Sequence, residues 1–327
     1  MLEKYKDMNK RKKEVKYIGD YNNDFLNDFL IGIHSEDFVL IASETGTGKS
    51  EFVYDLAFHN AKKLRVHLFA LESDVDEPYL RQMYKLIAED YYRHRGTNPV
   101  LEMSYRNYIA NKIDTTPYEE NAMREMLKYK NLTVHYREGG TFDVVNLTQK
   151  VGMIKDDCDM IILDHVDYFD LDGSENENAQ MTEIMKTLRN INQVYRIPVI
   201  VVSHLRKKSN RKIALPSIDD LHGSSNKAKI AKTVILFAKD YEKQNYLEAL
   251  SPTFCYVGKS RIGGTGSLVG ILMYDLKRNK YMKDYNLGVV KMHGEKVEEL
   301  PNDRYPKWAK GSIYHPEEVR VGKEQTV

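Results

Sequence analysis

The segment "SETGTGKS" (43–50) constrains the fold more than any other stretch of this 327-residue chain. It directly follows the apolar run "DFVLIA" (37–42), which is typical of a buried strand, and precedes a helical pattern. Its spacing matches a phosphate-binding loop (P-loop) except that Ser43 replaces the first glycine. Gly46 and Gly48 would let backbone N–H groups turn towards phosphate oxygens at a helix N-terminus. An ordinary glycine-rich turn is the alternative, but the order of strand, loop, Lys-Ser and helix favours a phosphate site.

The loop is expected to bind ATP together with Mg²⁺. Lys49 would reach the β- and γ-phosphate oxygens, and the Ser50 hydroxyl would be a magnesium ligand. The predicted nucleotide-binding residues of the loop are Ser43, Glu44, Thr45, Gly46, Thr47, Gly48, Lys49 and Ser50.

Short apolar runs without alternation indicate strands that are covered on both faces of a parallel sheet. Beside 37–42, these runs are 65–70, 132–136, 159–164 and 198–203, and helical patterns lie at 49–61, 78–92 and 180–195. The alternation predicts an α/β fold with a mostly parallel, doubly wound sheet. The runs 233–238, 253–258 and 267–275 are expected to add antiparallel strands at one edge, and 93–130 to be a helical insertion.

Composition indicates a soluble, cytoplasmic protein. Apolar residues make up 42% of the chain, and no signal peptide or membrane-spanning run is apparent. The net charge is only +1, so a site for a polyanion must be a local basic patch. We expect a basic N-terminal segment (1–29), one α/β domain (30–287) and a C-terminal tail (288–327).

Two acidic residues are expected beside the nucleotide, because the carboxyl ends of parallel strands meet at one edge of the sheet. Asp164 ends the run "MIILD" and is the candidate magnesium-side acid, acting directly or through water. Glu72 follows the second strand and could polarise the attacking water. A helix-capping role is the alternative for this acid, but it fits Asp74 or Asp76 better. The nearby Asp167 and Asp170 are expected only to solvate the loop after the strand.

With these elements in order, the chain resembles the RecA-like motor domain of DnaB-type hexameric replicative helicases and of the ring helicases of phages and mitochondria. The resemblance covers about residues 30–285 and rests on six motifs in one order: "SETGTGKS", "FALESD", "IILDHVDYF", "PVIVVSHLRKK", "DDLHGSSNKAKIAKTVILFAKD" and "GKSRIGG". It implies that Glu72 is the catalytic base and that Asp164 is the magnesium-side acid. It also implies that His204 senses the γ-phosphate. DnaB has Gln at this last position and the phage-type rings have His; a strand-capping histidine is the alternative.

The late stretch "YVGKSRIGGTG" (256–266) is not a second P-loop, because its lysine precedes the glycines and a strand follows. We expect a strand–turn–strand unit that holds Lys259 and Arg261 out at an edge. In the resembling helicases a Lys-x-Arg element reaches the nucleotide of the adjacent subunit, which implies a homo-oligomeric, hexameric ring. Solvated edge-strand cations are the alternative.

A basic run follows the strand that ends at His204. The resemblance places a loop for single-stranded DNA there, and a solvated loop is the alternative. The predicted DNA-binding residues are Arg206, Lys207, Lys208, Arg211 and Lys212.

The function that the sequence favours is a ring-forming, ATP-driven translocase on single-stranded DNA, a replicative-type DNA helicase that hydrolyses ATP at subunit interfaces. The alternative is a DNA-dependent ATPase of the RecA/KaiC kind that acts as a recombination mediator or a nucleotide-switched assembly module. A small-molecule kinase is a third and weaker hypothesis. Any primase or loader is expected to be a separate protein.

Overall fold

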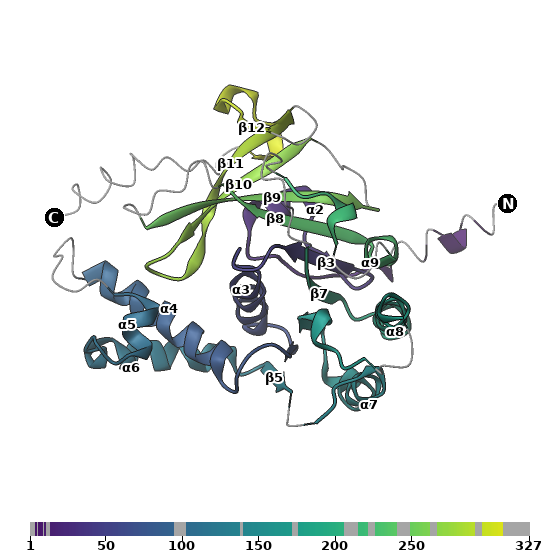
Figure 1. The fold of residues 1–327 in the computed structure, drawn as a ribbon, viewed down its shortest axis with the longest axis horizontal. Coiled ribbons are helices and arrows are strands. Elements are labelled where there is room, and N and C mark those ends of the chain that lie inside the picture. The colour runs from purple at the N-terminus through teal and green to yellow at the C-terminus, as the bar shows by residue number, and fades with distance from the viewer. Residues whose placement is uncertain are drawn as a thin grey trace.

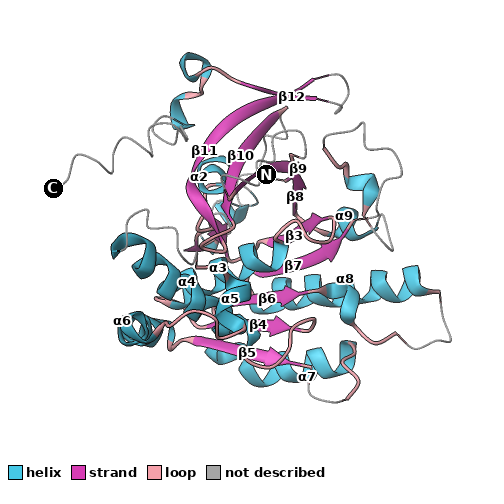
Figure 2. Cartoon of the chain, turned by 60° about the vertical axis from the view of Figure 1, so that its left-hand side comes forward, coloured by secondary structure: helices cyan, strands magenta, loops and turns pink. Residues whose placement is uncertain are grey.

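The computed structural model describes residues 14–94, 103–137, 140–171, 176–205, 215–221, 226–240, 249–261, 267–291 and 296–309, with residues 4, 6–8 and 10 near the N-terminus. Six parallel strands form one side of its main sheet (Figures 1 and 2). They are β3 (Phe38–Ser43), β4 (Val66–Ala70), β5 (Leu132–Tyr136), β6 (Met160–Asp164), β7 (Val199–His204) and β8 (Thr233–Lys239). Their spatial order is β8-β3-β7-β6-β4-β5, and the predicted doubly wound sheet is confirmed.

Four antiparallel strands extend the sheet beyond β8. These are β9 (Leu250–Ser260), β10 (Leu268–Asp275), β11 (Lys280–Lys291) and β12 (Lys296–Glu299). One detail of the prediction was wrong, because β8 itself is parallel to β3, with Val39 opposite Thr233 and Ser43 opposite Phe237. β8 can run parallel to β3 because the connection from β7 to β8 is long enough to cross back over the sheet. This connection contains the helix α9 (Asn226–Ile230). Antiparallel pairing therefore begins at β9.

Helices cover both faces of the parallel strands (Figure 1). One face carries α3 (Lys49–Ala61), and its core also contains buried side chains of α2 (Asp24–Leu30). The other face carries α7 (Val144–Ile154) and α8 (Glu177–Tyr195), with α9 beside them. The alternation of buried residues along β3 explains this division, since Val39 and Ile41 face the first core while Phe38 and Leu40 face the second.

The segment 93–130 is helical where the structure describes it. A small separate core joins α4 (Glu77–His94) to α5 (Tyr105–Ile109) and α6 (Thr116–Met126), which is followed by a 3₁₀ turn at Leu127–Tyr129. No helix in the described ranges is long and apolar enough to cross a lipid bilayer.

Two expected boundaries fall inside regular elements. The position between residues 29 and 30 lies within α2, whose Phe25 is fully buried against Tyr285 of β11. The position between residues 287 and 288 lies within β11, which continues to Lys291 and pairs with β12. Before α2, the strand β1 (Tyr17–Gly19) pairs with β2 (Ile33–His34). Both expected boundaries therefore lie within regular secondary structure.

A stacked histidine pair joins β4 to the edge strand β5. His67 Nδ1 lies 2.9 Å from His135 Nε2, and the ring of His135 also stacks on Phe69. Burial lowers the pKa of His135 to about 4, and the neighbouring His67 contributes in the same direction. Both imidazoles are therefore neutral in the folded protein at neutral pH.

The buried pair of His67 and His135 predicts that the folded protein loses stability in acid. An unfolded chain protonates His135 near pH 6.5 but the folded chain does so only near pH 4, so stability is lost as the pH falls between these values. At about 1.4 kcal/mol per pKa unit, the shift from 6.5 to about 4 lowers the free energy of unfolding in acid by at most about 3.5 kcal/mol, and the partial exposure of His135 reduces this effect. His135→Phe should flatten the decline in the free energy of unfolding between pH 7 and pH 5, measured by chemical denaturation. His94→Phe, at an exposed histidine, is the control, and equal slopes in both variants would contradict the assignment.

Candidate nucleotide-binding and catalytic site

The P-loop joins the end of β3 to the start of α3, as the sequence predicts. Gly46 has φ +78° and Gly48 has φ +98°, in the left-handed region where other residues are strained. The structure also shows why Ser43 is compatible with the loop. It is the last residue of β3, and its hydroxyl donates to the carbonyl oxygen of Glu44 at 2.9 Å, so no unusual backbone angle is needed there.

The structure adds one residue to the loop that sequence reasoning missed. The hydroxyl of Tyr281, on β11, donates to the carbonyl oxygen of Thr47 at 2.9 Å. A Cβ at position 48 would lie 2.9 Å from the same hydroxyl. The loop is therefore held from the antiparallel part of the sheet, and a Gly at 48 is needed for this close approach as well as for its backbone angle.

Lys49 is buried beneath the loop. Its Nζ donates to the carbonyl oxygens of Ser43 at 3.1 Å and Glu44 at 3.0 Å, and lies 3.4 Å from Nδ1 of His204. Burial lowers the pKa of Lys49 to about 8, although nearby carboxylates, Asp164 first, oppose this effect. The ammonium group is thus charged at neutral pH and positioned inside the loop that would surround the phosphates.

Asp164 ends β6 at the same edge of the sheet, and its side chain is fully buried. Its Oδ1 lies 2.8 Å from Nε2 of His165, but neither carboxylate oxygen accepts a hydrogen bond of good geometry. A buried carboxylate without such partners is costly unless a cation joins it. This residue therefore fits the chemistry of a magnesium shell shared with Ser50 of the loop.

Glu72 lies beside Asp164, because the backbone N–H of Leu71 donates to the carbonyl oxygen of Asp164 at 2.7 Å. Its carboxylate is partly exposed, accepts a hydrogen bond from the hydroxyl of Tyr168 at 3.1 Å, and lies 3.2 Å from Nε2 of His165. The structure thus brings both predicted acids to the edge that carries the P-loop. A solvent-accessible carboxylate at this place is suited to activate water.

Two histidines connect Lys49 with these acids. His204, the last residue of β7, lies with Nδ1 towards Lys49 and with Nε2 at 2.9 Å from Nδ1 of His165. A lysine ammonium group can only donate, so Nδ1 of His204 accepts from Lys49 and Nε2 of His204 carries the hydrogen. This Nε2–H donates to Nδ1 of His165. The Nε2–H of His165 then faces the carboxylates of Asp164 and Glu72. Burial lowers the pKa of His204 to about 4, with His165 and Lys49 acting in the same direction, so its imidazole is neutral. Sequence reasoning missed His165, and its place directly after Asp164 was the available signal.

The prediction that Asp167 and Asp170 only solvate their loop was wrong. Asp167 accepts hydrogen bonds from the hydroxyl of Ser203 at 3.0 Å and from the backbone N–H of His204 at 2.8 Å, and it forms an ion pair with the fully buried Lys227 of α9. Asp170 pairs with Arg137 and accepts from the backbone N–H of Phe142. The physical reason is the 3₁₀ turn Val166–Tyr168, which directs Asp167 back beneath β7.

The Asp167–Lys227 pair yields a stability prediction. Lys227→Met removes the cation and leaves a poorly solvated carboxylate, which typically costs 3–5 kcal/mol, so the free energy of unfolding should fall by about that amount. Adding Asp167→Asn should recover a large part of the loss, because no unpaired charge remains. Chemical denaturation of the two single variants and the double variant measures the coupling, and strictly additive losses would contradict it.

Lys259 and Arg261 lie away from the P-loop of their own chain. Ser260 is opposite Thr233 at the start of β8, whereas the P-loop residue Ser43 is opposite Phe237, four positions or roughly 13 Å further along the strand. The Lys259 ammonium donates to the carbonyl oxygens of Ala228, Lys229 and Ala231 at the end of α9, and Arg261 reaches Lys229 at 3.5 Å. The two cations lie at the end of β9, and the carbonyl oxygens at the end of α9 accept hydrogen bonds from both.

The five predicted DNA-binding residues, Arg206, Lys207, Lys208, Arg211 and Lys212, lie outside the described residues. What the structure describes is the base of this segment. Leu205 and Leu221 form an antiparallel bridge, and the N–H of Leu205 donates to the carbonyl oxygen of Ser43 at 3.0 Å. The segment thus begins one residue after His204, with its first residue bonded to the start of the P-loop.

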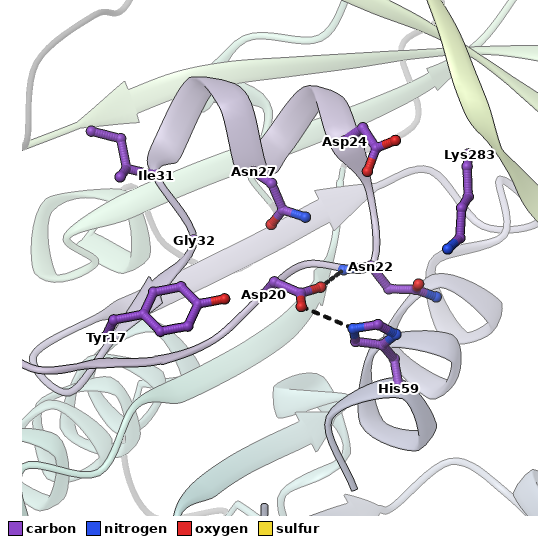
Figure 3. Close-up of a pocket in the computed structure, with 9 residues that line it drawn as sticks. All are labelled: Tyr17, Asp20, Asn22, Asp24, Asn27, Ile31, Gly32, His59 and Lys283. Atoms are coloured by element: carbon purple, nitrogen blue, oxygen red, sulfur yellow. Dashed lines mark hydrogen bonds and ion pairs between the residues drawn. The ribbon is translucent and has the colours of Figure 1, made fainter. Parts of the chain in front are cut away.

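One hollow in the structure is not a nucleotide site. It has a volume of about 450 Å³, and its lining includes Asp20, Asp24 and His59 (Figure 3). His59 Nε2 lies 2.9 Å from Asp20, and this contact lowers the pKa of the aspartate. The hollow lies near the end of α3, ten residues or about 15 Å from Lys49, and its aspartates would repel a polyphosphate.

The fold and the residues at the carboxyl edge define a P-loop nucleotide-binding protein of the RecA-like class. Residues 22–283 match the family described as "DnaB-like helicase C terminal domain", which is most of the chain. The chain belongs to this family.

Relatives and solved structures agree with this assignment. A "Probable replicative DNA helicase" of Trieres chinensis is 26% identical over 278 residues, which are 82% of this chain and 57% of the relative. "Replicative DNA helicase DnaB" of Geobacillus stearothermophilus is 22% identical over 268 residues, with 78% and 52% covered. The chain thus spans a little over half the length of these relatives. The solved structure of a DnaB-like replicative helicase superposes with a TM-score of 0.67 at 16% identity, over 82% of this chain and 63% of that one, which supports the fold.

Proposed function

We propose that this chain is the ATP-hydrolysing motor of a ring-forming DNA helicase that moves along single-stranded DNA. The observation that carries the proposal is the separation of two functional halves within one chain. The P-loop, both acids and the two histidines gather at the carboxyl edge of the sheet, whereas Lys259 and Arg261 lie at the opposite end of β8. Two such halves can form one complete active site only at an interface between two copies of the chain, which we call a seam.

The residues of the carboxyl edge have distinct roles in this proposal. The backbone of residues 44–50 binds the phosphates of ATP, and Lys49 exchanges its loop carbonyls for phosphate oxygens. Ser50 and Asp164 would hold Mg²⁺, which when bound neutralises phosphate charge. Glu72, partly exposed, accepts a proton from the attacking water. His204 is a neutral imidazole, and it would turn its single N–H from His165 to the γ-phosphate when ATP is bound.

The seam supplies the remaining charge. Arg261 and Lys259 of one subunit would reach the phosphates in the P-loop of the next, and a guanidinium in such a place contributes on the order of 10³–10⁵ to turnover. This role requires the two side chains to leave the α9 carbonyls that they contact in a single chain. We propose a hexameric ring, with the basic segment after His204 facing the DNA strand.

The first test measures ATP hydrolysis with and without single-stranded DNA, together with strand displacement from a forked duplex. We expect DNA to stimulate hydrolysis and the strand to be displaced, and Glu72→Gln to abolish both while the variant still binds nucleotide. Stimulation without displacement would replace the helicase with a DNA-dependent ATPase of another kind. Hydrolysis that is indifferent to DNA would contradict the proposal.

The second test mixes subunits that are inactive for different reasons. Arg261→Ala subunits keep their own P-loop edge, and Glu72→Gln subunits keep their own Arg261, so the mixture should regain part of the ATPase activity at seams that combine the intact halves. A mixture of Arg261→Ala with Lys259→Ala is the matched control, because no seam in it has both cations. Activity that fails to recover at every ratio of the first mixture would rule out a shared site.

A further inference from the structure

Glu72, His165 and His204 form a cluster that magnesium chemistry does not require. Each offers one potential ligand atom, and these atoms all lie within 4.8 Å of one another. His165 is central to it, because its Nδ1 lies 2.9 Å from His204 and its Nε2 lies 3.2 Å from Glu72. The cluster therefore combines two imidazoles with a carboxylate, beside the buried Asp164.

A second observation indicates that a cation belongs here. The side chain of His165 is only 2% exposed, and its Nε2 has no hydrogen-bond partner of good geometry. Buried polar atoms without partners are rare in native structures, and a metal ion that they surround would satisfy them.

The ligand types decide which metal the cluster favours. Magnesium prefers oxygen ligands in octahedral geometry, whereas imidazole with carboxylate suits zinc and related transition metals. Metal–nitrogen bonds of about 2.0–2.1 Å place the ligand atoms of a tetrahedral site roughly 3.3 Å apart. The separations of 2.9 Å and 3.2 Å involve opposite nitrogens of the His165 ring, and only one of these nitrogens can bind the ion. The three ligand atoms lie within 4.8 Å of one another, so side-chain rotations must bring them to this value.

We propose that Glu72, His165 and His204 bind a divalent cation of the zinc class, separately from the magnesium shell of Ser50 and Asp164. Binding of this cation stands on the geometry of the nucleotide-free chain alone. The effect of this cation on ATP hydrolysis rests on the proposed function, because a bound cation would occupy both the carboxylate that activates water and the imidazole that faces the γ-phosphate. Zinc would then inhibit hydrolysis by lowering kcat, with little change in the KM for ATP.

The test is a titration of the full chain, free of affinity tags and nucleotide, with Co²⁺ as a visible probe for the zinc class. We expect a saturable absorption band with one Co²⁺ per chain, which Zn²⁺ abolishes by competition. His165→Ala and Glu72→Gln should each weaken the affinity at least about tenfold, the lower end of what the loss of even an outer-shell partner costs. Glu72 is partly exposed, so this second variant tests the cluster even if the first folds poorly.

A matched control is available in the same protein. His67 and His135 also lie 2.9 Å apart, but no cluster of three metal-ligating side chains includes them in the described part of the chain. His135→Ala should therefore leave the Co²⁺ band unchanged. Absence of the band, or a band that survives both His165→Ala and Glu72→Gln, would overturn the proposal. Because this readout needs no turnover, it is independent of the helicase tests.

Discussion

The buried carboxylate of Asp164 is the constraint on which the nucleotide edge depends. Its side chain is fully buried and accepts no well-formed hydrogen bond, so its charge must be balanced by cations and dipoles nearby. Lys49 supplies part of this balance, and the field of Asp164 is the largest influence that opposes the effect of burial on the lysine. The charge of Asp164 therefore favours the ammonium form of Lys49, whose position is held by the carbonyl oxygens of Ser43 and Glu44.

The same constraint explains the histidine pair. His165 follows Asp164 directly and lies between the two acids and His204. One ring therefore contacts both His204 and Glu72, the residues proposed to face the γ-phosphate and to activate water. A change at one end of this chain of donors and acceptors alters what the other end can accept. The pair thus joins Lys49 to Glu72 across four strands of the sheet.

Much of this could be predicted from the sequence, and the exceptions have physical reasons. The glycines, Lys49, Asp164 and Glu72 follow apolar runs whose strands end at one edge, so their gathering depends on topology alone. The direction of β8 could not be predicted from its own residues, because an apolar run has the same pattern in either direction. The partners of Asp167 and Lys259 depend on the exact placement of α9, which is distant in sequence from both. The role of His165 becomes visible only when β6 and β7 are placed together.

The short helix α9 has a consequence for cooperation between copies. Its Lys227 is paired with Asp167, which also accepts from the backbone of His204, while the last carbonyls of α9 hold Lys259. One five-residue helix therefore contacts Lys259, proposed to act on the next subunit, and through Asp167 it is linked to His204, proposed to face the subunit's own nucleotide. In a closed ring, a displacement of this helix after hydrolysis at one seam would loosen or tighten the following seam, so that neighbouring copies turn over in sequence and not all at once.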